Sequence, residues 1–329
     1  MVQAGLDWPT AGALALAIAV ALAWDARFGE PPARLHPVVG MGWMLAALGR
    51  RVAPQPQAPA RPQRALVAGA LAWTLGAAGV AALAWGLQAL SSGAPGWWLQ
   101  GLALGVLLKP LLAWRMLRDE VAAVEAALAQ GLDVGRAQVA RLVSRDVQML
   151  DEAGVRQAAL STLAENLNDS VVAPLFWFAL AGLPGAALYR WANTADAMWG
   201  YRGVRDGRDW TWAGRWAARA DDVLSWLPAR LTAVLLLAAS GRGLPWSALR
   251  AQARRTPSPN GGWPMGALAL RLGVRLVKPG VYALHACGRL AQPADTARAL
   301  LWCGRAVAGW GALLVAGLAL LELIGGRPS

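Results

Sequence analysis

The sequence predicts an all-α, polytopic integral membrane protein. Hydrophobic residues make up 57% of the 329-residue chain and charged residues only 15%, whereas soluble globular domains carry about 25% charged residues. The apolar residues gather in long stretches, which is typical of membrane-spanning helices. The formal net charge of +12 comes almost entirely from arginine, and basic residues concentrate in the cytoplasmic loops of membrane proteins.

Four apolar stretches approach the length of about 20 residues that a helix needs to cross the hydrocarbon core. They are residues 9–24, 65–90, 97–113 and 306–324. No basic segment precedes the first stretch, so we expect a retained membrane helix there rather than a cleaved signal peptide. The sequence therefore predicts about four full spans, joined by helical cytoplasmic loops.

Two further apolar stretches, 171–188 and 229–241, are interrupted or short. Gly182, Pro184 and Gly185 interrupt the first, and such residues turn a helix more readily than they continue it. We expect the first stretch to form a re-entrant or obliquely packed hairpin. The second is expected to be another partial insertion or a tilted short helix.

The placement of arginine predicts how the chain is oriented. The first basic residue is Arg27, and the connection 91–96 carries no charge. By the positive-inside tendency, the N-terminus and 91–96 lie outside, while the arginine-rich residues 114–170 lie inside. A hairpin at the fifth apolar stretch returns the arginine-rich residues 190–228 to the inside, where a full span would put them outside.

We accordingly expect one membrane-embedded domain over residues 1–329. Residues 25–64 would form a cytoplasmic loop that contains a proline-rich connector. Residues 114–305 would form a catalytic region on the cytoplasmic face, including the membrane hairpin at 171–188.

Several kinds of site are excluded by residue counts and missing motifs. The two histidines, His36 and His285, are too few for a multi-histidine zinc site, and neither Cys287 nor Cys303 has a partner at metal-binding spacing. No stretch interleaves aromatic and basic residues on a polar background, so we expect no nucleic-acid partner. The chain also lacks a G-x-x-x-x-G-K-[ST] loop and a G-x-S-x-G motif.

The most polar segment beside an apolar stretch contains Glu165, Asn166 and Asp169. Two carboxylates four residues apart share one face of a helix. Carboxylates next to a membrane segment are costly unless they are paired or metal-bound, and carboxylates with substrate phosphates are what Mg²⁺ prefers. The alternative is that these residues only cap a helix at a solvated edge.

Other candidate residues are scattered along the chain. An Asp pair, Asp221 and Asp222, points to different sides of a helix, and we favour Asp222 as the member that reaches a site; the alternative is a local salt-bridge set. Backbone amides of the turn-rich segment 256–264 could approach an anion, although most such segments are only loops. The remaining candidates are His36, Arg145, Asp146, Asn193, Thr194, Asp196, Arg230, Ser258 and Asn260.

Taken together, these motifs resemble the adenosylcobinamide-phosphate synthase family of cobalamin biosynthesis, called CobD or CbiB. The resemblance extends over about residues 25–285. It rests on five signatures in family order: "GEPPARLHPV", "SRDVQMLDEAGVRQAALSTLAENLNDSVVAPLFW", "GLPGAALYRWANTADAMWGYR", "AARADDVLSWLPARLTA" and "SPNGGWP".

The resemblance implies an ATP-dependent amide ligase in the bacterial inner membrane, with its active site facing the cytoplasm. Its substrates would be the corrinoid adenosylcobyric acid and an aminopropanol phosphate. ATP would be the energy source and Mg²⁺ the metal. The implied partners are these substrates and the lipid bilayer. Other membrane enzymes of cobalamin assembly, and further copies of the same chain in a homo-oligomer, are compatible with the resemblance.

The resemblance and residue chemistry together suggest roles for the candidate residues. Glu165, Asp169 and Asp196 would be catalytic, and Glu165, Asp169 and Asp222 would bind the metal. Substrate and phosphate binding would fall to His36, Arg145, Asp146, Asn166, Asn193, Thr194, Arg230, Ser258 and Asn260.

The chain departs from the family pattern at several positions. The pattern has Glu at Ser161 and Met265, Ser at Ala197 and Asn at Ser225. Two lost carboxylates keep two alternatives open: a non-catalytic membrane sensor or binding relative, similar to AmpE, and a corrinoid-binding membrane protein or transporter.

Overall fold

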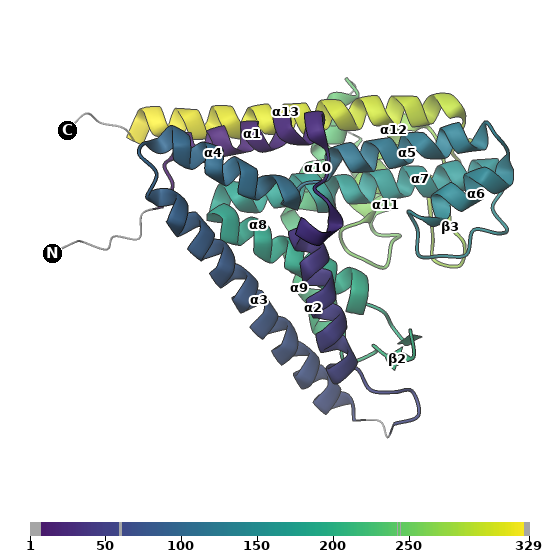
Figure 1. The fold of residues 1–329 in the computed structure, drawn as a ribbon. Helices are drawn as coiled ribbons and strands as arrows, with labels where there is room; N and C mark the ends of the chain where they lie inside the picture. The colour runs from purple at the N-terminus through teal and green to yellow at the C-terminus, as the bar shows by residue number, and fades with distance from the viewer. Residues whose placement is uncertain (1–7, 59–60, 242, 244, 326–329) are drawn as a thin grey trace. The chain divides into compact units, whose positions relative to one another are not determined.

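The computed structural model describes residues 8–58, 61–241, 243 and 245–325. Within these residues the regular secondary structure is helical apart from two short β-hairpins (Figure 1), which confirms the predicted all-α class. The α-helices are α1 Ala11–Phe28, α2 Pro37–Val52, α3 Pro62–Ser92, α4 Trp97–Leu108, α5 Trp114–Leu128, α6 Leu132–Ala140, α7 Glu152–Leu167, α8 Ala173–Trp199, α9 Arg215–Leu224, α10 Trp226–Ala239, α11 Trp246–Ala253, α12 Gly262–Leu272 and α13 Pro293–Gly325. Two 3₁₀ turns are η1 Ala33–Leu35 and η2 Lys109–Leu111, and one π turn is η3 Asn168–Val172. The hairpins pair β1 Val204–Arg205 with β2 Arg208–Asp209, and β3 Leu276–Lys278 with β4 Tyr282–Leu284.

Among the described residues, five helical segments are long and apolar enough to cross a membrane: Ala11–Phe28, Pro62–Ser92, Trp97–Leu128, Glu152–Trp199 and Pro293–Ile324. Three of the four predicted spans fall within one of them, and the fourth, 9–24, overlaps Ala11–Phe28 except for its first two residues. The bent pair α9 and α10, with 47° between its helices, passes the same test as a sixth candidate. The structure therefore agrees with a helical polytopic membrane protein.

The fifth predicted apolar stretch is broken where its sequence indicates. Within α8 the backbone leaves the helical region at Ala181 (φ −136°, ψ 21°) and Gly182 (φ 59°, ψ −156°). The side-chain oxygen of Gln88 accepts a hydrogen bond of 2.9 Å from the N–H of Leu183, which satisfies one backbone donor freed by the break. Whether this segment is a hairpin in the membrane stays a prediction. Most of the other short stretch, 229–241, lies in the 14-residue helix α10, which ends at Ala239.

The chain divides into two compact units. Unit 1 contains the described residues of Met1–Leu112, Ala173–Leu224 and Leu313–Ser329, and unit 2 contains Ala113–Val172 and Ser225–Ala312. The expected single membrane-embedded domain, with its cytoplasmic loop at 25–64 and catalytic region at 114–305, stays a prediction.

In unit 1, α1 packs closely on α4, and α3 and α9 pack on α8. Two glycines of α4 allow the first contact: a Cβ at Gly101 would lie 2.9 Å from the backbone oxygen of Ala13, and one at Gly105 would lie 2.7 Å from Val20. Small residues let membrane helices approach this closely.

In unit 2, α7 packs against α5, α6 and α12, and α12 also packs against α10 and α11. Arg156 of α7 joins this core electrostatically, because its guanidinium lies 2.8 Å from Glu125 of α5 and 3.2 Å from Glu152. The same Glu125 accepts a hydrogen bond of 3.0 Å from Thr296 of α13. These contacts position α7, which carries the most polar segment of the chain.

Candidate functional site

The predicted acidic segment lies where α7 passes into the π turn η3. Glu165 and Asn166 belong to the last turn of α7, whereas Asp169 belongs to η3. Asn168 secures the turn, since its amide oxygen accepts from the Thr232 hydroxyl at 3.2 Å and its NH₂ donates to Asp169 at 2.7 Å. The four-residue spacing of Glu165 and Asp169 therefore crosses from α into π geometry, which corrects the expectation of a continuous α-helical face. Single π turns occur frequently at functional sites.

A cavity of about 130 Å³ in unit 2 opens beside Glu165. Its polar lining combines one carboxylate, Glu165, with two cations, Arg145 and Lys278. The other lining residues are Leu142, Val143, Ser144, Ala158, Ser161, Thr162, Asn166 and Tyr282. Asp146 and Asp169 are not among them: Asp146 is exposed and accepts a turn hydrogen bond of 2.9 Å from the N–H of Gln148.

The β3–β4 hairpin contributes two of these side chains. Lys278 and Tyr282 are directly opposite each other in its register, and opposite residues of an antiparallel pair point to the same face. The hairpin is tied to the rest of the cavity through Val277. Its N–H donates to the side-chain oxygen of Gln157 at 3.2 Å, and its carbonyl accepts from Arg145 at 3.3 Å. Arg145 thus positions the hairpin as well as lining the cavity.

The loop at 256–264 also approaches Glu165. A Cβ at Gly261 would lie 3.2 Å from Oε1 of Glu165, so the glycine permits this approach. The loop is shaped by Arg230 of α10, which donates to Oδ1 of Asn260 at 3.1 Å and also to the Trp226 carbonyl. The N–H of Asn260 donates to the Ser258 hydroxyl at 3.2 Å. The structure therefore brings Arg230, Ser258 and Asn260 together, with Arg230 holding the loop.

Burial and neighbouring charged groups both shift the pKa of the Tyr282 hydroxyl. Burial raises the pKa of Tyr282, and the neighbouring Glu165 carboxylate raises it further, while Ser161 and Arg145 lower it. Burial also lowers the pKa of Arg145 from its usual value, but a guanidinium remains charged at physiological pH. At neutral pH the cavity therefore offers one carboxylate, two cations and a neutral phenol that can donate a hydrogen bond.

This shift predicts a stability difference between the protein and its Tyr282→Phe variant at alkaline pH. Because the folded-state pKa lies above that of the unfolded chain, the contribution of Tyr282 is fully present below about pH 10 and is lost as the pH rises through the folded-state pKa. We expect the thermal midpoint of the protein in detergent to fall more steeply above about pH 10 than that of the variant. If the thermal midpoints of the protein and of the Tyr282→Phe variant fell equally steeply above about pH 10, this assignment would be contradicted.

Two positions at which the chain departs from the family pattern, Ser161 and Met265, lie beside the phenol of Tyr282. The Tyr282 hydroxyl donates to the sulfur of Met265 at 3.4 Å. Ser161 lines the cavity, and its hydroxyl donates to the Gln157 carbonyl at 2.8 Å. The two positions at which the family resemblance implies carboxylates thus both adjoin Tyr282, which leaves Glu165 as the single carboxylate of the cavity lining.

Five predicted site residues belong to unit 1, four of them on α8 and α9 and the fifth, His36, at the start of α2. Asn193 accepts from Arg190 at 3.4 Å, and the Thr194 hydroxyl donates to the Arg190 carbonyl at 2.6 Å. Asp196 lies against Gly200, where a Cβ would come within 2.0 Å of Oδ1 of Asp196. Asp222 lies on α9, which packs on α8. The sharing of one site by these residues and those of unit 2 stays a prediction.

His36, also in unit 1, belongs to a network of buried and half-buried ionisable side chains. Lys109 Nζ lies 3.2 Å from Oδ1 of Asp25 and 2.9 Å from Oε1 of Glu30. The other oxygen of Glu30 lies 3.0 Å from Nε2 of His36. Nδ1 of His36 accepts from the N–H of Val38 at 3.2 Å and so caps α2. This geometry accounts for His36 as a structural group, while its predicted substrate contact stays a prediction.

The predicted magnesium ligands are divided between the units, with Glu165 and Asp169 in unit 2 and Asp222 in unit 1. The described part of the chain contains no group of three or more His, Cys, Asp or Glu side chains that could hold a metal ion. Magnesium that arrives with substrate phosphates needs only one or two protein carboxylates. Glu165 beside the cavity fits that mode of binding.

Sequence reasoning missed Lys278 and Tyr282 as cavity residues. A signal was present, because the chain contains only two lysines, Lys109 and Lys278. The structure puts one in a buried charge network and the other in the cavity. In an arginine-rich chain, retention of lysine marked positions where a compact point charge is used.

Comparison with known proteins supports the family resemblance. The family model of the CobD/Cbib protein matches residues 18–301. The chain is 39% identical to "Probable cobalamin biosynthesis protein CobD" of Thermococcus kodakarensis, over 88% of this chain and 91% of that protein. It is also 39% identical to "Cobalamin biosynthesis protein CobD" of Chromobacterium violaceum, over 94% of this chain and 98% of that protein. No solved structure matches the chain. The chain therefore belongs to the CobD/CbiB family of cobalamin-biosynthesis proteins.

Proposed function

We propose that the chain is an ATP-dependent amide ligase that joins adenosylcobyric acid to an aminopropanol phosphate. The observation that supports this most directly is the cavity of unit 2, in which Glu165 faces the same space as Arg145 and Lys278. A phosphorylated amine needs both kinds of group: cations for its phosphate and a base for its ammonium proton. The volume of about 130 Å³ suits a molecule of this size and is far too small for a corrinoid ring.

The reaction proceeds in two balanced steps. The corrinoid carboxylate attacks the γ-phosphorus of ATP; a new O–P bond forms, the bridging bond to the β-phosphate breaks and ADP leaves. The amine nitrogen then attacks the acyl carbon, the C–O bond to the phosphate breaks, and inorganic phosphate leaves as the amide forms. Glu165 takes the ammonium proton that must leave before the nitrogen can attack, and the proton lost as the amide forms leaves with the inorganic phosphate.

Three other groups hold the amine substrate during this sequence. Arg145 and Lys278 bind its phosphate, the arginine through a bidentate contact and the lysine as a point charge. Tyr282, a neutral phenol at physiological pH, exchanges its hydrogen bond to the Met265 sulfur for one to the substrate. Mg²⁺, when bound with the phosphates of ATP, would neutralise charge at the transferred phosphoryl group. The corrinoid approaches from outside the cavity.

The cellular setting follows from the same proposal. The relatives are named as cobalamin-biosynthesis proteins, and the part of the chain that the structure describes contains five candidate membrane spans. We place the protein in the bacterial inner membrane with the cavity of unit 2 facing the cytoplasm, where ATP is available.

The test uses the full chain purified in detergent. Incubation with adenosylcobyric acid, aminopropanol phosphate, ATP and Mg²⁺ is expected to yield the amide, detected by mass spectrometry, with one ADP released per amide formed. Omission of ATP is expected to abolish the product. Binding of adenosylcobyric acid without turnover, under conditions where the Chromobacterium violaceum relative forms product, would instead favour a non-catalytic corrinoid-binding protein.

A further inference from the structure

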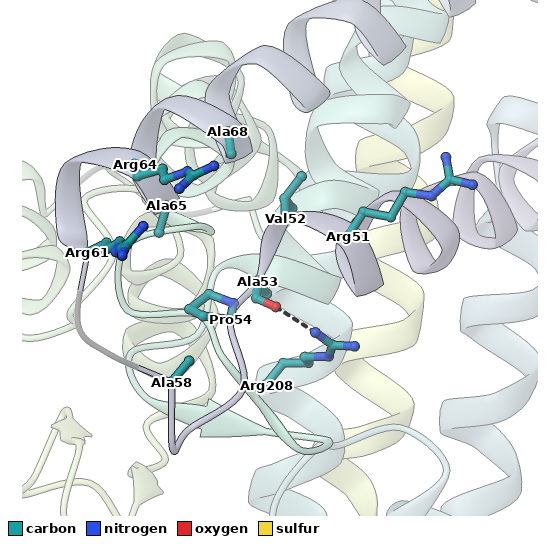
Figure 2. Close-up of a pocket in the computed structure, with 10 residues that line it drawn as sticks. All are labelled: Arg51, Val52, Ala53, Pro54, Ala58, Arg61, Arg64, Ala65, Ala68 and Arg208. Atoms are coloured by element: carbon teal, nitrogen blue, oxygen red, sulfur yellow. Dashed lines mark hydrogen bonds between the residues drawn. The ribbon is translucent and has the colours of Figure 1, made fainter.

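A second polar pocket lies in unit 1, far along the chain from the residues of the proposed reaction (Figure 2). Its volume is about 400 Å³. Its walls are the end of α2 with the residues that follow it, the first turns of α3, and Arg208 of β2. We call it the arginine pocket, and its lining is Arg51, Val52, Ala53, Pro54, Ala58, Arg61, Arg64, Ala65, Ala68 and Arg208.

The charge of this lining is entirely positive. Four of its residues are arginine and none is acidic. One arginine, Arg208, is used structurally, since it donates to the Ala53 carbonyl at 2.9 Å (Figure 2). In the described residues, no carboxylate lies within ion-pair distance of Arg51, Arg61 or Arg64. The pocket therefore gathers positive charge that the protein itself does not neutralise.

The nearest carboxylate in sequence is already engaged. Asp209 follows Arg208, and its Oδ1 accepts a hydrogen bond of 2.9 Å from the N–H of Thr211. Its backbone N–H donates to the Pro54 carbonyl at 2.9 Å, which attaches the β1–β2 hairpin to the connector after α2. Hydrogen bonds of Arg208 and Asp209 thus hold the walls of the pocket in place without supplying a counter-charge to Arg61 and Arg64.

The position of Arg61 and Arg64 adds to the attraction for an anion. Both lie at the start of α3, whose cap residue Arg61 makes no side-chain capping hydrogen bond. The N-terminus of a helix carries partial positive charge and free N–H groups. Guanidinium groups bind phosphate oxygens in a bidentate manner. Figure 2 shows the side chains of Arg61 and Arg64 extending from the same end of α3, whereas the side chain of Arg51 extends from α2.

We propose that the arginine pocket binds the phosphate group of an anionic ligand. This site is independent of the proposed amide-forming cavity, since it shares no residue with it. α3 is a candidate membrane span, so the pocket lies where that helix would enter the bilayer, at the depth of lipid headgroups. The phosphate can accordingly come from an anionic phospholipid or from a phosphorylated solute.

The test measures binding to the full chain in detergent with three probes: short-chain phosphatidylglycerol, short-chain phosphatidylcholine and pyrophosphate. The key variant is Arg61→Gln with Arg64→Gln. Its matched control is Arg250→Gln with Arg254→Gln, which removes two exposed arginines one turn apart at α11. We expect saturable binding by the wild type, a loss of at least about tenfold in affinity in the key variant, and no change in the control. Higher salt should weaken binding by the wild type.

The probes separate the two sources of phosphate. Binding of phosphatidylglycerol but not pyrophosphate assigns the pocket to a lipid headgroup, and the reverse assigns it to a soluble phosphate compound; binding of both supports a phosphate site open to either. Equal binding of phosphatidylcholine and phosphatidylglycerol, with no pyrophosphate binding, would overturn the proposal. So would unchanged affinity in the key variant. If that variant fails to fold, Arg61→Lys with Arg64→Lys replaces it: weaker binding than the wild type is expected, and equal binding overturns the proposal.

Discussion

Replacement of Glu165 by Gln is expected to lower kcat for amide formation by about 10²- to 10⁴-fold, which is the usual contribution of a general base. Glutamine keeps the size and hydrogen-bonding capacity of the side chain but cannot accept the proton that the amine must lose. Arg145 and Lys278 still line the cavity, so KM for the amino-alcohol phosphate should change much less than kcat. Steady-state product formation by the purified variant measures both quantities.

The matched control for this prediction is Asp133→Asn. Asp133 is an exposed carboxylate of the same unit, with 93% of its side chain accessible, and it pairs with Arg136 at the surface. We expect the control to keep wild-type kcat. If Glu165→Gln retained activity within about twofold of the wild type, a loss far below that of a general base, Glu165 would not be the base, and the proposed mechanism would fail even if the protein proved to be the synthase.

Replacement of Lys109 by Met should destabilise the protein by about 3–5 kcal/mol, the range measured when one member of a buried ion pair is removed. The side chain of Lys109 is 4% exposed, and it lies within 3.2 Å of Asp25 and 2.9 Å of Glu30. Its loss removes the ammonium group that lies against both carboxylates in a poorly solvated site. Thermal or denaturant unfolding in detergent is the appropriate measurement.

Two further variants test whether the cause is the uncompensated charge. In Lys109→Met combined with Asp25→Asn and Glu30→Gln, the whole charge group is neutralised, and we expect much of the lost stability to return. Arg118→Met removes an exposed cation that pairs with Asp119 at 2.8 Å, and it should cost less than about 1 kcal/mol. Equal stability of the Lys109 and Arg118 variants would refute the electrostatic account.

Features encoded by neighbouring residues could be predicted from the sequence. Apolar stretches of sufficient length mark the four spans because each helix satisfies its own backbone hydrogen bonds. The break in α8 could be located as well, since Gly182 adopts a φ of 59° that other residues adopt reluctantly. The ordered motifs around Glu165 and Asn260 indicated the family that the comparisons confirmed.

The residues of the cavity could not be assembled in this way. The β3–β4 hairpin brings Lys278 and Tyr282 to α7 through a hydrogen bond between Val277 and Gln157, which lie 120 positions apart. A pattern of neighbouring residues in the sequence does not predict a contact between segments so far apart in the chain. The same limit explains why Asp146 was included among the predicted binding residues although its carboxylate caps a surface turn.

The sequence by itself determined the class of the protein, the location of four long apolar stretches, the position of the break in α8 and the family, because these depend on composition, periodicity and the order of short motifs. It did not determine the number of long apolar helices, since the stretch 171–188, expected to be a partial insertion, lies in a fifth segment that is long and apolar enough to cross a membrane. Only the tertiary structure decided that Glu165 shares a cavity with Arg145 and Lys278, that Arg230 shapes a loop, and that Lys109 pairs with the buried Asp25 and the half-buried Glu30. The physical reason is that charges act on each other through space, and their partners are chosen by packing between segments remote in the chain.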